Sequence, residues 1–169
     1  MTTDARAIYA SSLRNTHALE QQGLQQLEVQ IPRLEHYPDY AALLTKHIET
    51  TRGQIARLDQ ALQAVGESPS TLKETVTSMV GTVGATVHAL TQDETLKNLY
   101  AGYAFQYQQI AAYRSLITIA ETVGETAHSS GFRQSIQEEE LAAQQVADII
   151  EPVTCRYVEL TLSGNKADR

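Results

Sequence analysis

The segment YAFQYQQIAAYRSL, residues 103–116, has the pattern of a helix whose apolar side contains two glutamines. Steps of three and four residues place apolar side chains on one face of a helix. One such row is Leu99, Tyr103, Gln106, Ile110, Tyr113, Ile117 and Ala120, and the row beside it is Phe105, Gln109, Ala112, Leu116 and Ile119. Burying an amide costs free energy unless it is hydrogen-bonded. Gln106 and Gln109 are therefore expected to face other polar groups inside the protein.

Three other segments have the same helical period. We expect the first helix to run from Thr2 or Thr3 to about Pro32, and the second to begin after residue 39 and stop at Gly66. The third is expected to begin with a cap at Asp93 and to stop at Gly124. The fourth is expected to begin after residue 131 and to end at Pro152 or beyond. Pro152 either kinks or ends the last helix, unless the segment VTCRYVELTL (153–162) continues it.

The long connection between the second and third of these helices has a different composition. Residues 67–93 are rich in Thr, Val and Gly, and we expect a weaker helix there, capped by Ser70. Short loops make neighbouring helices antiparallel, whereas a long connection must travel the length of the bundle. The expected fold is all-α, a four-helix bundle of two antiparallel hairpins joined by a long crossover that contains a shorter helix. Residues 1–163 form its single domain, and residues 164–169 are expected to be a disordered tail.

Composition excludes several classes of function. The 169 residues carry a formal net charge of −7, which argues against nucleic acid or an anionic membrane surface as a partner. No apolar run approaches the roughly 20 residues of a membrane span, and MTTDARAIYASSL (1–13) lacks the features of a secretory signal. Cys155 is the single cysteine, so an internal disulfide is impossible and a cytoplasmic location is expected.

Each expected helix has a polar interruption near its middle. These are Glu20 in the first helix, Glu49 and Arg52 in the second, Gln106 and Gln109 in the third, and Glu139 or Glu140 in the fourth. Because the middles of antiparallel helices meet, these side chains are expected to form one buried polar layer. Carboxylates that project inward from four helices are also how a bundle holds two metal ions. Taken singly, each residue could instead lie at a partly exposed position.

Three segments carry a resemblance to a known family. They are HIETTRGQIARLDQALQAVGESP (47–69), YQQIAAYRSLITIAETVG (107–124) and IQEEELAAQQ (136–145), and they follow THALEQQ (16–22) in the expected order. Together they resemble the YciE/YciF-type ferritin-like proteins, which are bacterial and associated with stress responses. The resemblance implies a ferritin-like four-helix bundle, a homodimer and a possible two-metal centre.

The metal positions of that family are only partly kept in this chain. The resemblance assigns kept carboxylates to Glu20, Glu49 and Glu140, with Glu139 as the alternative to the last. The changed positions are Arg52 and Tyr107 in place of histidines, Gln106 and Gln109 in place of glutamates, and Gln144 in place of an aspartate. Glutamine binds a divalent ion weakly and does not offset its charge, so the two-metal site is expected to be degenerate.

These changes favour a protein without enzymatic activity or a cofactor. Arg52 would take the electrostatic role of a metal and bridge the carboxylates, since a guanidinium satisfies buried carboxylates through hydrogen bonds. An iron oxidase, an iron store or a manganese catalase needs two metals close together, so all three are disfavoured. His17, one turn before Glu20, is expected to be a core or boundary residue rather than a ligand.

Two alternatives remain open at this point. In the first, Glu20, Glu49 and Glu140 bind a single Fe or Mn ion in a redox protein, which requires Arg52 to turn away to solvent. In the second, the polar layer is a pocket for a small molecule, lined by Gln106, Gln109 and Tyr107. The direction of Arg52 and the presence of a cavity distinguish these possibilities from a metal-free scaffold.

Overall fold

The computed structural model describes residues 2–67 and 94–168, and these residues form four long helices. The helices are α1 (Thr2–Gln30), α2 (Pro38–Ala64), α4 (Glu94–Val123) and α5 (Ser129–Leu162), with short 3-10 turns at Ile31–Arg33 and Thr126–His128. The weaker helix expected in the crossover, with its cap at Ser70, and the cap at Asp93 lie outside the described residues. The all-α architecture predicted from the sequence is confirmed.

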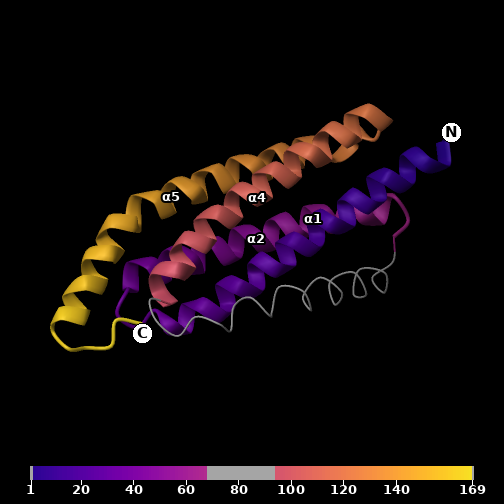
Figure 1. Cartoon of the computed structure of the whole chain (residues 1–169). Coiled ribbons are helices and arrows are strands. Elements are labelled where there is room, and N and C mark those ends of the chain that lie inside the picture. The colour runs from indigo at the N-terminus through magenta and orange to yellow at the C-terminus, as the bar shows by residue number, and fades with distance from the viewer. Residues whose placement is uncertain (1, 68–93, 169) are drawn as a thin grey trace.

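The helices form two antiparallel hairpins packed side by side. Figure 1 shows α1 against α2 and α4 against α5, and the hairpins meet through contacts of α1 with α4 and of α2 with α5. Within the described ranges, none of the helices has the apolar length that a bilayer requires.

Two glycines end helices where the sequence predicts a stop. Gly66 follows α2 with φ of 82°, and Gly124 follows α4 with φ of 81°. In this left-handed conformation the chain turns back on the helix, and the N–H of Glu67 reaches the Leu62 carbonyl at 3.1 Å. Both predicted stops are therefore confirmed.

Pro152 lies inside α5, which continues to Leu162. The segment 153–162 thus continues the helix, which was one of the two alternatives that the sequence left open. Figure 1 shows α5 bending toward its C-terminal end, and a proline within a helix favours such a bend because it removes one backbone hydrogen bond.

The prediction of a disordered tail is wrong for residues 164–168. The Tyr37 hydroxyl donates to the Ala167 carbonyl at 2.7 Å, and Ala167 is buried. The Asp168 carboxylate accepts the Thr95 backbone N–H at 3.1 Å, in the first turn of α4. A carboxylate at a helix N-terminus satisfies an otherwise free donor and complements the helix dipole. These contacts, made by an aspartate and an alanine in a polar segment, hold the tail against the bundle.

The apolar core is divided into two clusters. One cluster lies toward the N-terminal end of α1 and the C-terminal end of α2, and it includes Tyr9, Leu13, Leu58, Tyr113, Leu116 and Phe132. The other lies toward the opposite end and includes Tyr37, Tyr40, Leu44, Leu99, Val146 and Leu160. Buried polar side chains from the middles of the helices lie between them.

Candidate functional site

All four long helices contribute buried polar side chains to one region in the middle of the bundle. We call this region the polar centre, and it consists of Glu20 of α1, His47, Thr51 and Gln54 of α2, Gln106 and Gln109 of α4, and Ser135 and Glu139 of α5. Its members are linked by contacts between helices that are far apart in sequence. The polar centre is therefore the candidate functional site of this bundle.

Glu20 is completely buried and is held by an amide. The side-chain N–H of Gln109 donates to Oε2 of Glu20 at 2.7 Å, which joins α4 to α1. The pKa of Glu20 is raised to about 8, chiefly by burial and then by the negative charge of Glu139. The Tyr113 hydroxyl and the Gln109 amide oppose this rise. At neutral pH the protonated, uncharged form of Glu20 is consequently favoured.

Glu139 has a similar environment on the other side of the polar centre. Its Oε1 accepts the side-chain N–H of Gln54 at 2.8 Å and lies 3.5 Å from Nε2 of His47. Burial raises the pKa of Glu139 to about 7, and burial lowers the pKa of His47 to about 4. Because His47 is neutral near pH 7, its contact with Glu139 is not an ion pair.

The predicted position of Arg52 in the interior is wrong. Its guanidinium is exposed and pairs with Glu49 at 2.6 Å and with Glu28 at 3.2 Å. Glu49 is also on the surface, with 70% of its side chain exposed. The buried residues between Ile48 and Ile55 are Thr51 and Gln54. Burying these neutral side chains in place of Arg52 avoids the large desolvation penalty of a charged group.

Glu140 and Gln144 also lie outside the polar centre, contrary to their assignment. The Glu140 carboxylate is exposed and accepts Arg114 at 3.1 Å, while the exposed Gln144 donates to Asp148 at 2.8 Å. The alternative residue on α5, Glu139, is the buried one. Of the three carboxylates assigned to a metal, the structure therefore brings only Glu20 into the polar centre and leaves Glu49 and Glu140 on the surface.

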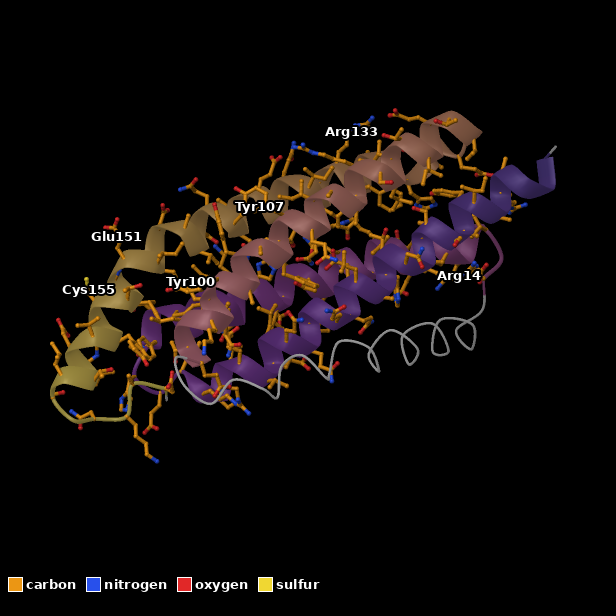
Figure 2. All side chains as sticks on the ribbon, in the orientation of Figure 1. Arg14, Tyr100, Tyr107, Arg133, Glu151 and Cys155 are labelled. Atoms are coloured by element: carbon orange, nitrogen blue, oxygen red, sulfur yellow. The ribbon has the colours of Figure 1, made fainter. Side chains whose placement is uncertain are left out.

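Tyr107 faces away from the interior as well. Its side chain is about half exposed on the outer side of α4, where Figure 2 labels it with Tyr100. Its ring meets that of Tyr103 edge to face, with centroids 5.3 Å apart. Tyr107 therefore does not line a pocket together with Gln106 and Gln109.

Among the described residues, Arg57 is a positively charged group that approaches the polar centre, and the sequence analysis did not select it. Its Nε donates to the Ser135 hydroxyl at 3.2 Å, and its guanidinium also pairs with Glu138. The charge of Arg57 acts to lower the pKa of Glu20. Arg57 forms its ion pair with Glu138 rather than with Glu20 or Glu139. The hydrogen bonds to the two buried carboxyl groups come from the amides of Gln109 and Gln54.

Of the other members of the polar centre that the sequence did not reveal, Ser135 lies on α5 and the rest lie on one row of α2. His47, Thr51, Gln54 and Leu58 follow one another at helical steps beside the apolar row of Ile48 and Ile55. This second row, which leads into the apolar Leu58, is the signal in the sequence that marks His47, Thr51 and Gln54. The expectation for His17 agrees with its placement, since its Nε2 lies 3.0 Å from Asp59 at the edge of the bundle.

The polar centre does not have the ligands of a two-metal site. Such a site in a helix bundle uses about four carboxylates and two histidines, whereas the buried carboxylates among the described residues are Glu20 and Glu139. Each of these already accepts a hydrogen bond from a glutamine. Within residues 2–67 and 94–168, no three His, Cys, Asp or Glu side chains gather as metal ligands would. The residues present do not fit a pair of metal ions.

Solved structures with the same fold support this architecture. The chain resembles a protein from Xanthomonas campestris pv. campestris with 23% identity and a TM-score of 0.77, over 94% of this chain and 99% of that one. It also resembles an archaeal dps-homologue from Halobacterium salinarum with 21% identity and a TM-score of 0.68, over 87% of this chain and 81% of that one. At these identities the likeness establishes the fold, a ferritin-like helical bundle.

The sequence itself matches a family over nearly its whole length, from residue 4 to residue 159. The match includes the four described helices almost completely and every member of the polar centre. The chain therefore belongs to the family described as Domain of unknown function (DUF892).

Proposed function

We propose that this protein is a non-enzymatic ferritin-like protein of the YciE/YciF type, in which a metal-free polar centre replaces the two-metal site. It acts through binding or assembly rather than through redox chemistry. The observation that carries this proposal is the pairing of each buried carboxylate with an amide from a neighbouring helix. Gln109 donates to Glu20 and Gln54 donates to Glu139, so both contacts use a donor where a metal centre would have a cation.

The charge of the polar centre supports the same conclusion. With the pKa of Glu20 raised to about 8 and that of Glu139 to about 7, the pair carries about one negative charge or less at neutral pH. A divalent ion would have to displace protons from both groups, and such competition weakens metal binding. The polar centre therefore favours protons and amide donors over metal ions.

The proposal also includes the assembly and location that the sequence suggests. We expect a homodimer in the cytoplasm, in the context of a bacterial stress response. Tyr100 and Tyr107 support an interface between two copies because both large side chains are about half exposed on α4. Cys155 is exposed, and a reducing compartment would keep its thiol free. Light scattering coupled to size-exclusion chromatography measures the assembly directly, and a monomer at micromolar concentration would contradict the dimer.

Elemental analysis tests the metal-free centre. The protein is purified after expression with added iron and manganese, and the metal content per chain is measured together with the circular dichroism spectrum. We expect substantially less than one metal per chain in a folded helical protein. Two metals per chain would overturn the proposal and justify assays of oxidase and catalase activity. One metal per chain would overturn it in favour of a mononuclear site.

A further inference from the structure

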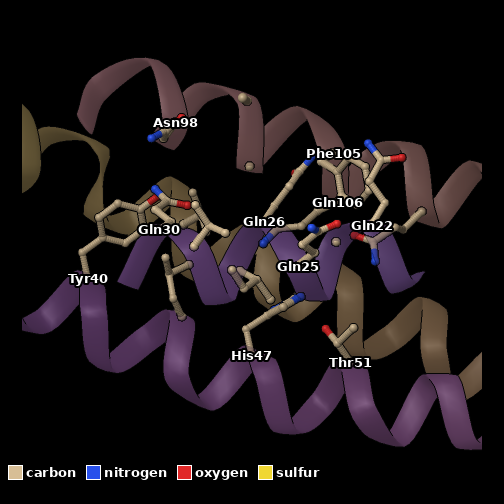
Figure 3. Close-up of a pocket in the computed structure, with 18 of the residues that line it drawn as sticks. Gln22, Gln25, Gln26, Gln30, Tyr40, His47, Thr51, Asn98, Phe105 and Gln106 are labelled. Carbon is tan, nitrogen blue, oxygen red and sulfur yellow. The ribbon is translucent and has the colours of Figure 1, made fainter. Parts of the chain in front are cut away.

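A cavity of about 330 Å³ lies between α1 and α4, with α2 beneath it. Figure 3 shows Tyr40, His47 and Thr51 reaching toward it from α2, and Phe105 and Gln106 on the α4 side. Small-molecule sites in proteins have volumes of about 300–1,000 Å³, so this cavity is large enough for a compact organic molecule. It adjoins the polar centre, because His47, Thr51, Gln106 and Gln109 belong to both.

Two glycines line the cavity, one on each of the helices that border it. A Cβ on Gly23 of α1 would lie 2.8 Å from the Phe105 ring, so glycine is needed for the close approach of that ring. A Cβ on Gly102 of α4 would meet no atom within 4 Å, although Gly102 lines the cavity. Glycine inside a helix is unfavourable by about 1 kcal/mol relative to alanine. At Gly102 the absence of a side chain therefore maintains open volume at the expense of helix stability.

The cavity has an apolar body. Leu27 of α1, Leu44 of α2, Phe105 of α4 and Val146 of α5 line it. Near them Gln30 and Tyr40 satisfy each other, since the Gln30 amide donates to the Tyr40 hydroxyl at 2.7 Å. Around these residues a ligand would meet apolar surface and a paired amide and hydroxyl, while the amides of Gln22, Gln25, Gln26 and Asn98 also line the cavity.

The end of the cavity next to the polar centre is different, because buried polar atoms there lack partners. The Gln106 side-chain carbonyl and the Thr51 hydroxyl have no hydrogen-bond partner among the described residues. Gln106 is 5% exposed and Thr51 is 0% exposed, so bulk water does not solvate them. Buried polar groups are almost always paired in native proteins. A ligand with an O–H or N–H donor would satisfy the Gln106 carbonyl, and the Thr51 hydroxyl can donate or accept.

The charges around the cavity argue for an uncharged ligand. Among its described lining residues, the ionised side chains are Arg33 and Glu94, and these pair with each other. His47 is neutral because burial lowers its pKa to about 4. A charged ligand would therefore lose its hydration without gaining an opposite charge.

We propose that the cavity binds a small, uncharged, amphipathic molecule, with an apolar body between α1 and α4 and a hydroxyl or N–H donor directed at Gln106 and Thr51. This goes beyond the proposed function by naming a site and a class of ligand, and it does not depend on the metal content of the polar centre.

A pair of fluorescent probes tests the proposal. N-phenyl-1-naphthylamine is uncharged, mostly apolar and carries one N–H donor, whereas 1-anilinonaphthalene-8-sulfonate has the same aromatic frame with an added negative charge. We expect saturable binding of the uncharged probe at one site per chain, and binding of the sulfonate weaker by about tenfold or more because its charge would be buried unpaired. Absence of binding by the uncharged probe, or equal binding of both, would overturn the proposal.

Two glycine variants locate the binding. Gly102→Leu fills the cavity and removes an unfavourable helical glycine, so it should fold and lose binding of the uncharged probe. Gly53→Leu is the matched control, because Gly53 is also helical, does not line the cavity, and its Cβ would meet only the end of Arg57 at 3.9 Å. Binding that survives Gly102→Leu would show that the probe lies elsewhere and would overturn the proposal.

A third variant tests the polar end. Gln106→Leu removes the unpaired carbonyl and should weaken binding of N-phenyl-1-naphthylamine by about fivefold to tenfold, the effect of one hydrogen bond. The N-methylated probe, which has no N–H donor, should bind equally to both proteins. If Gln106→Leu weakened the binding of both probes by the same factor, that result would contradict the proposed hydrogen bond. Probe binding that disappears as the protein dimerises would assign the cavity to a second copy of the chain and overturn a small-molecule site.

Discussion

The side-chain amide of Gln109 on α4 donates to the buried carboxyl group of Glu20 on α1 across 2.7 Å. This contact joins the two hairpins at the middle of the bundle. Gln54 and Glu139 make the corresponding contact between α2 and α5 at 2.8 Å. In each pair one oxygen of a buried carboxyl group accepts an amide N–H from another helix, which offsets part of the cost of placing glutamate between the apolar clusters.

Replacing Gln109 by methionine should destabilise the protein by about 1–3 kcal/mol, because the buried Glu20 loses its donor while the side-chain volume is nearly kept. Chemical denaturation followed by circular dichroism measures the free energy of unfolding. The matched control is Gln108→Met, one residue away and exposed, which should change stability by about 0.5 kcal/mol or less.

A double-mutant cycle separates the contact from the effect of each side chain. Glu20→Met with Gln109→Met should destabilise by less than the sum of the single changes, because neither polar group is then left unpaired. Strictly additive effects would mean that Glu20 and Gln109 are not coupled in solution.

Stability should also depend on the protonation of Glu20. Its pKa is raised from 4.5 to about 8 in the folded protein, so the folded state binds this proton more tightly than the unfolded chain does. The resulting stabilisation is complete below about pH 4.5 and is lost as the pH rises toward about 8, by up to about 1.4 kcal/mol per pH unit. Glu139, with a pKa of about 7, contributes in the same direction over a narrower range.

The Glu20→Gln variant isolates this contribution, because glutamine mimics the protonated carboxyl group and does not titrate. The free energy of unfolding of the unsubstituted protein minus that of Glu20→Gln should fall between pH 5 and pH 8. Surface carboxylates cancel in this difference. A difference that stays constant, or that rises with pH, would show that Glu20 is ionised in the folded protein.

The sequence predicted the helices and the buried glutamines well because both depend on local signals. Gly66 and Gly124 ended their helices as expected, and Gln106 and Gln109 are buried in the rows where their spacing put them. A helical row constrains a residue strongly when apolar residues continue on both sides of it, as they do around Gln106 and Gln109.

The choice between neighbouring residues was harder to make. Thr51 and Arg52 both fit between Ile48 and Ile55, because steps of three and four residues are equally helical. The same ambiguity separates Glu139 from Glu140. Tertiary packing decides which of two neighbouring residues is buried. The free-energy cost of burying a charge favours Thr51 over Arg52 at the interior position. A pocket at Gln106 and Gln109 was among the alternatives that the sequence offered, but its position and the exclusion of Tyr107 depend on how α1 and α4 approach each other.

The two arginines of α2 provide a test of these placements. Arg57→Ala should destabilise the protein by about 1–2 kcal/mol, because the half-buried guanidinium connects α2 to Ser135 and Glu138 of α5. Arg52→Ala should have an effect of about 0.5 kcal/mol or less, because its ion pairs with Glu28 and Glu49 are exposed. Denaturation of both variants in parallel measures this difference. A larger effect at Arg52 than at Arg57 would indicate that Arg52 is the interior cation after all.

Placing carboxylates at the two buried glutamines of α4 should create a metal site. Gln106→Glu with Gln109→Glu would bring four carboxylates together with His47 in the polar centre, which approaches the ligand set that two divalent ions require. We expect binding of Mn²⁺ by calorimetry and a rise in melting temperature with added metal, since a ligand that binds only the folded state stabilises it. The control Gln108→Glu adds one negative charge on the exposed side of α4 and should do neither. If the double variant is folded and still binds no metal, the side chains of the polar centre do not converge on one point, and the replacement of a two-metal site would no longer explain these glutamines.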